Sequence, residues 1–108
     1  MNDLLRAHVE RFNEGARSRD WSSMLELLTD DAELRFEGVP VGPFVGKDAI
    51  AAAYAEQPPD DEIDVLSVDE RDGELVAVYA WRREGRPTGR LILTPRGDLI
   101  ARLVVTFD

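Results

Sequence analysis

Four strand-like runs occupy the C-terminal part of the chain, and short turn sequences separate them. The runs span residues 62–70, 74–83, 88–94 and 99–107. The turns between them contain Asp72-Gly73, Glu84-Gly85 and Arg96-Gly97-Asp98. Glycine beside a charged residue in so short a connection is typical of β-hairpins, which join antiparallel neighbours. The pattern therefore predicts an antiparallel meander of four strands.

The residues before this meander have helical periodicity. In residues 2–17, apolar side chains recur three and four positions apart, which predicts an amphipathic helix. A second helix is predicted from Trp21, with Asp20 as its N-cap and Thr29-Asp30-Asp31 at its end. A third is predicted over Lys47–Glu56. We therefore expect an α+β fold, with three N-terminal helices packed on a mostly antiparallel sheet.

Two segments connect these helices. Residues 32–37 alternate between polar and apolar side chains and are expected to form a short strand. Glycine and proline recur through residues 38–46, which predicts a loop that holds at most one short extended piece. No internal repeat or linker divides the chain, so residues 1–108 are expected to form one domain.

Composition excludes several classes of function. The chain has no cysteine and one histidine, so neither a thiolate zinc site nor a two-histidine zinc motif is expected, and no metal is predicted. The formal net charge is −9, which argues against binding to nucleic acid. No apolar run approaches the ~20 residues of a membrane-spanning helix, and no signal-peptide pattern is present, so a cytoplasmic protein is expected. Phosphate-binding glycine motifs are also absent, and no cofactor is predicted.

Several short motifs resemble the SnoaL-like group of the nuclear transport factor two superfamily, which includes ketosteroid isomerase and limonene epoxide hydrolase. Together they extend over nearly the whole chain in the same order. The motifs are Phe12-Asn13, Asp20-Trp21, Leu27-Leu28-Thr29-Asp30-Asp31-Ala32, Gly42-Pro43-Phe44-Val45-Gly46-Lys47-Asp48-Ala49-Ile50, Gly97-Asp98-Leu99-Ile100-Ala101-Arg102 and Phe107-Asp108.

The resemblance implies a cystatin-like cone, in which a curved sheet wraps the first helix around a deep, mostly apolar pocket. It also implies a homodimer. Members of the group include isomerases, cyclases, dehydratases and proteins without known chemistry, so the fold does not transfer a reaction.

Two residues are candidates for catalysis. His8 lies within the apolar stripe of the first helix, near the place where the resemblance puts the oxyanion-stabilising tyrosine of ketosteroid isomerases. It is either a general acid or base or a core histidine with a protein partner. Glu37 is the carboxylate nearest to the position of the family's proton-shuttling aspartate, or else a solvated strand end. The second acid of those isomerases would fall near Gly89 or Arg90, and no acid stands there.

Four further residues are candidates for binding a ligand. Arg102 interrupts an apolar strand and Arg90 lies on the preceding strand, so each binds a ligand anion or forms an ion pair. Residues 1–70 hold 6 basic and 17 acidic side chains against 7 and 5 in residues 71–108, so an anionic group would bind on the side of the sheet. Tyr54 and Tyr79 either line the pocket or belong to the core.

The last strands are apolar on both faces. In residues 74–83 and 99–107, most side chains at both odd and even positions are apolar. A sheet with one solvated face should instead alternate, so its second face is expected to meet another copy of the chain. The alternative is local curling that buries both faces.

Three functions remain open. The first is a cofactor-free isomerase, cyclase or dehydratase that acts on a small hydrophobic molecule with a carbonyl or anionic group. The second is a pocket that binds such a molecule without turnover. The third is a dimeric structural module. Convergence of His8, Glu37 and Arg102 on one cavity would favour catalysis, whereas an apolar cavity with one polar group would favour binding.

Overall fold

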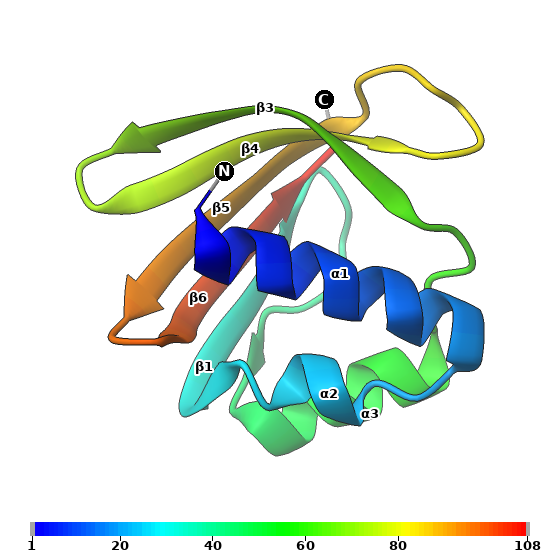
Figure 1. Cartoon of the computed structure of the whole chain (residues 1–108). Coiled ribbons are helices and arrows are strands. Elements are labelled where there is room, and N and C mark those ends of the chain that lie inside the picture. Colours follow the sequence, from blue (N-terminus) through cyan, green and yellow to red (C-terminus); the bar gives the residue numbers. More distant parts are fainter. Residues whose placement is uncertain (1, 108) are drawn as a thin grey trace.

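The computed structural model describes residues 2–107 and has three helices on one side of a six-stranded sheet (Figure 1). Asp108 of the last motif lies outside the described residues. The elements are α1 (Asp3–Ser18), α2 (Ser22–Leu25), β1 (Leu28–Glu37), β2 (Phe44–Val45), α3 (Lys47–Glu56), β3 (Ile63–Arg71), β4 (Glu74–Trp81), β5 (Gly89–Arg96) and β6 (Leu99–Thr106). Within this range, no helix combines the length and the apolar character that a membrane crossing needs.

The strand order is β2-β1-β6-β5-β4-β3, and all neighbours are antiparallel except β1 and β6. The meander of β3 to β6 is therefore confirmed. The parallel pair brings Leu34 beside Leu103 and Phe36 beside Val105, and so joins the first strand to the last. The sheet bends strongly, and α1 crosses its concave side (Figure 1). The expected α+β cone with a curved, mostly antiparallel sheet is the observed fold.

The second helix is much shorter than the sequence predicts. It ends at Leu25, and Thr29-Asp30-Asp31, expected to close a helix, belongs to β1 instead. The Ile100 N–H donates to the carbonyl oxygen of Leu27 at 2.7 Å, so β6 holds this segment extended. Tertiary pairing here outweighs the poor strand propensity of aspartate.

Reciprocal hydrogen bonds between α1 and β3 fix the helix on the concave side. The amide of buried Asn13 donates to the carbonyl oxygen of Ile63 at 3.1 Å and accepts from the Ile63 N–H at 2.8 Å. Near the end of the same helix, a Cβ at Gly15 would collide with the Trp21 ring, which packs at a tilt against Tyr54 of α3. These contacts connect α1 to the sheet, and the helical segments to one another.

Candidate functional site

A cavity of about 600 Å³ lies between the concave side of the sheet and the helices. Buried lining residues, His8, Leu34, Tyr54 and Leu103 among them, form its closed end. Exposed lining residues form its mouth, and they come from the loop after β1, the end of α3 and the end of β6. They are Val39, Pro40, Val41, Gly42, Glu56, Gln57 and Phe107.

His8 is the polar residue whose position at the closed end demands an explanation. It is 2% exposed, and its Nδ1 has no hydrogen-bond partner among the described residues. Burial lowers the pKa of His8 from 6.5 to about 4, so the imidazole is neutral at pH 7 and carries one N–H donor and one acceptor. An unsatisfied buried polar atom costs ~1–3 kcal/mol, so the fold holds this imidazole here at some expense in stability.

Helical geometry sets this position. His8 and Phe12 are four residues apart on α1, so both face the sheet, and their ring centroids are 6.5 Å apart. The Phe12 ring then meets Trp21, which meets Tyr54. His8 and Tyr54 also border a second void of about 10 Å³ next to the cavity. The aromatic row thus holds His8 and Tyr54 at the same end of the cavity.

Two tyrosines complete the polar groups of the wall. Tyr54 is buried, and burial raises the pKa of its hydroxyl well above the usual value, so it is a neutral donor. The Tyr79 hydroxyl already donates to the carbonyl oxygen of Thr106 at 3.1 Å. Tyr79 therefore supports the wall, and Tyr54 is the better placed of the two to meet a ligand.

Glu37 does not join His8. The register of β1 turns Leu34 and Phe36 into the cavity, and Glu37, the next residue, is exposed at the strand end and outside the lining. The position expected for a second acid is also closed. A Cβ at Gly89 would overlap the carbonyl oxygen of Thr106, so no side chain fits there. Among residues 2–107, the carboxylates used by ketosteroid isomerases thus have no counterpart beside His8.

The two arginines lie on the opposite, outer face of the sheet. Arg102 is paired in register with Glu33, and its Nε is 3.5 Å from a Glu33 carboxylate oxygen. Leu91 lines the cavity, so its neighbour Arg90 points away from it, and the Arg90 N–H donates to Thr106 Oγ1 at 2.9 Å. The structure therefore separates His8, Tyr54 and Tyr79, which line the cavity, from Glu37, Arg90 and Arg102, which do not.

Acidic residues pair with Arg82 and Arg83, which follow β4. Arg82 lies 2.9 Å from both Glu62 and Asp64, and these carboxylates raise its pKa. Arg83 donates to the carbonyl oxygen of Asp60 at 2.6 Å, and its N–H donates to Asp61. The described residues contain no group of three or more acidic or histidine side chains placed to hold a metal ion.

Sequence reasoning missed most of the cavity wall. Leu91, Leu103 and Val105 line it from β5 and β6, and the alternation of those strands was the available signal. The mouth was also missed, because the loop over 38–43 has no regular periodicity. Among the lining residues that the structure describes, Glu56 is the one side chain that is charged at pH 7.

Comparison with solved structures identifies the fold as NTF2-like. An NTF2-like protein of unknown function from Burkholderia xenovorans superposes with a TM-score of 0.77 at 18% identity, over 98% of this chain and 80% of that one. A proposed polyketide cyclase from Sinorhizobium meliloti gives 0.68 at 19% identity, over 97% and 94%. A proposed ketosteroid isomerase from Kribbella flavida gives 0.67 at 15% identity, over 98% and 78%.

The sequence itself matches a family model. Residues 9–103 match the SnoaL-like domain, and the chain belongs to that family. No protein of curated function matches it. At these identities the solved structures establish the fold alone, and the activities named for them stay with those proteins.

Proposed function

We propose that this chain binds a small, mostly apolar molecule whose carbonyl or hydroxyl group meets His8 at the closed end of the cavity. The observation that carries the proposal is a buried, neutral imidazole that lines a mostly apolar cavity of about 600 Å³. Ligand sites of this kind combine an apolar wall with few polar groups that orient the ligand. His8 is the ligand's polar contact, and the Tyr54 hydroxyl is a second donor at the same end.

Isomerase or cyclase chemistry is the second candidate, favoured by the activities proposed for two structural neighbours. Proton abstraction beside a carbonyl needs a base within hydrogen-bond reach of the carbon. Among the described lining residues the one carboxylate is Glu56, which is exposed at the mouth, whereas His8 is buried. Binding without turnover is therefore better supported. Conversion of a β,γ-unsaturated cyclic ketone to its conjugated isomer, followed by ultraviolet absorbance, would instead support catalysis.

A neutral fluorescent dye tests the binding proposal. N-phenyl-1-naphthylamine should bind the wild-type protein at one molecule per chain with an increase in fluorescence. Ala53→Phe fills the cavity from α3 and should weaken binding at least tenfold. Ala52→Phe, the matched control, adds the same ring at an exposed position of the same helix and should leave binding unchanged. Equal binding by both variants, or none by the wild type, overturns the proposal.

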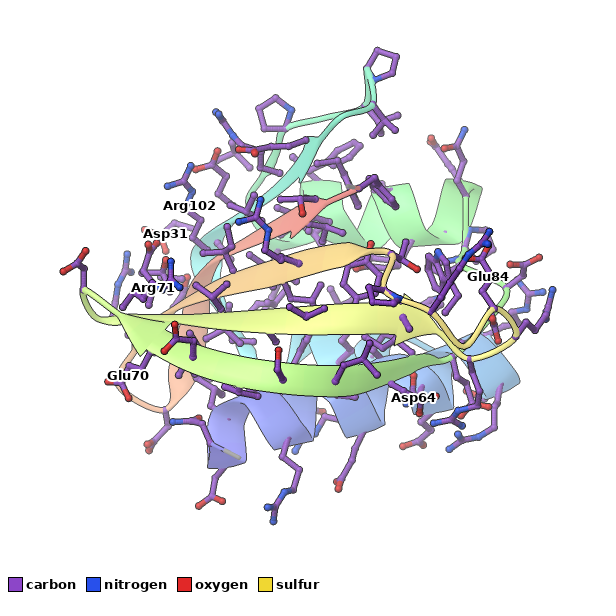
Figure 2. All side chains as sticks on the ribbon, turned by 90° about the horizontal axis from the view of Figure 1, so that it is seen from above. Asp31, Asp64, Glu70, Arg71, Glu84 and Arg102 are labelled. Carbon is purple, nitrogen blue, oxygen red and sulfur yellow. The ribbon has the colours of Figure 1, made fainter. Side chains whose placement is uncertain are left out.

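We also propose that the outer face of the sheet joins two copies of the chain. None of the described helices covers this face, which points toward the viewer in Figure 2. Val76, Ile92 and Val104 lie side by side across β4, β5 and β6, and the same row continues to Asp69 on β3 and to Arg35 on β1. The face is thus an apolar row with opposite charges at its two ends.

That arrangement favours self-association. A two-fold axis parallel to the strands places Asp69 of one protomer opposite Arg35 of its partner, and apolar residues meet apolar residues between them. Within one chain Val104 is already only 5% exposed, whereas Val76 and Ile92 are half-buried. A second copy supplies the cover that the helices do not.

A further inference from the structure

The charge of the cavity lining restricts the class of ligand, provided that the cavity binds a small molecule as proposed above. The described lining contains neither lysine nor arginine. His8, at the closed end, is neutral at pH 7 because burial lowers its pKa to about 4. A ligand anion would therefore find no opposite charge along the whole wall.

The mouth adds negative charge. Glu56 lies there, in the last turn of α3, and the adjacent Gln57 N–H bonds to the carbonyl oxygen of Ala53. The C-terminal end of a helix carries partial negative charge from its terminal carbonyl groups. A carboxylate at the mouth and the end of the helix dipole act in the same direction, since both repel anions and attract cations.

Arg90 and Arg102 do not supply the positive charge that the cavity lining lacks. Arg102 lies on the outer face, where Glu33 is its ion-pair partner at 3.5 Å, and Arg90 also points away from the cavity. The sequence suggested that an anionic group would bind near these residues. The sheet itself separates that position from the cavity.

We infer that the cavity selects uncharged apolar molecules, tolerates a cationic group at the Glu56 mouth, and excludes carboxylates. The neutral imidazole and the Tyr54 hydroxyl can donate hydrogen bonds to a ketone or hydroxyl oxygen. A carboxylate in the same place loses its hydration and gains at most neutral hydrogen bonds, and unpaired burial of a charge is strongly unfavourable. Ligands with an anionic head group are thus rejected by the absence of a partner.

Three ligands with one rigid skeleton test this inference by isothermal titration calorimetry at pH 7. We expect 2-adamantanone to bind, 1-aminoadamantane to bind within about fivefold of it, and adamantane-1-carboxylate to bind at least tenfold more weakly than the ketone. Carboxylate binding as tight as that of the ketone overturns the inference while leaving the binding proposal intact. Failure of the ketone itself to bind overturns the binding proposal and the inference together.

A matched pair of variants isolates Glu56. Glu56→Gln should weaken the amine and strengthen the carboxylate, each about threefold relative to the ketone. Glu14→Gln removes an exposed carboxylate of α1 outside the lining and should change none of the three. Since exposed charges are screened within about 8 Å at 0.15 M salt, the Glu56 effect should shrink in 1 M salt. If Glu56→Gln has the same ratio of amine to carboxylate affinity as the wild type, then the charge at the mouth does not select between these ligands.

Discussion

Asn13 of α1 and Ile63 of β3 exchange two hydrogen bonds although they are 50 residues apart in the sequence. The side-chain amide of Asn13 thus bonds to both the N–H and the carbonyl oxygen of Ile63, the first residue of edge strand β3. This pair holds α1 against the sheet at the level where Phe12 and Ile63 line the cavity.

Replacing Asn13 by alanine should lower the free energy of unfolding by about 2–4 kcal/mol, because two buried backbone groups lose their partners. Urea denaturation measures this change, and hydrogen exchange of the Ile63 amide reports it locally. Glu14→Ala, at the adjacent exposed position, is the control and should change stability by less than about 0.5 kcal/mol. Similar stability for both variants would show that the pair adds nothing to docking of the helix.

Gly15→Ala should destabilise the protein even though alanine is the better helix former. The helical preference is worth up to about 1 kcal/mol, but the added Cβ collides with the Trp21 ring. Overpacking typically costs about 1–3 kcal/mol, so a lower melting temperature is expected. In a Trp21→Leu background the same substitution should cost less, because the ring is gone. A rise in melting temperature on Gly15→Ala alone would contradict the close contact.

Stability should fall as the pH is lowered from 6.5 toward 4, because His8 is held neutral in the folded state. Its folded pKa is about 4 and its ordinary value is 6.5, so the unfolded chain binds the proton first. The contribution of neutral His8 to the free energy of unfolding is fully present above pH 6.5. About 2 kcal/mol of it should be lost between pH 7 and pH 5. Urea denaturation at the two pH values measures this loss.

His8→Phe is the control, since it removes the titrating group and should abolish this dependence. The aspartates with lowered pKa values act only at more acidic pH. Their hydrogen bonds and ion pairs place the pKa values of Asp20, Asp31, Asp61 and Asp69 below 3.8. The stability that these aspartates contribute is therefore lost mainly at a more acidic pH than the pH 7 to pH 5 interval in which His8 acts. A wild-type protein equally stable at pH 7 and pH 5 would show that His8 has a partner or is hydrated.

Ile92→Glu should convert a dimer into a monomer, because it places a carboxylate in the middle of the outer apolar row. Sedimentation equilibrium should give twice the 12.1 kDa chain mass for the wild type and the chain mass for this variant. Val45→Glu, on the exposed edge strand β2, should remain dimeric. A wild-type mass of 12.1 kDa would rule out self-association through this face.

The charges at the ends of the row define the orientation of the two copies. Asp69→Arg and Arg35→Asp should each weaken the dimer, and the combined variant should recover part of the lost affinity. Recovery is expected only where the two ends of the row face each other. Additive weakening would place the two-fold axis across the strands instead.

The hydrophobic periodicity was enough to predict the meander, α1 and α3, since these elements have strong patterns and clear stop signals. It failed over Thr29-Asp30-Asp31, where pairing with β6 holds aspartates in an extended strand. Burial of His8 followed from its place in the apolar stripe of the first helix. Which side of the sheet receives Glu37, Arg90 and Arg102 depends on register and bulges, and a single sequence specifies these weakly.

The parallel pairing of β1 with β6 has a consequence for synthesis of the protein on the ribosome. The cavity wall unites residues 34 and 36 with residues 103 and 105, so it cannot close before β6 has emerged. Helices and the β3–β4 hairpin form from local contacts, whereas this pairing spans most of the chain and is slow to form. A nascent chain therefore exposes the apolar residues of an incomplete cavity wall until β6 has emerged, and the cavity exists only after that point.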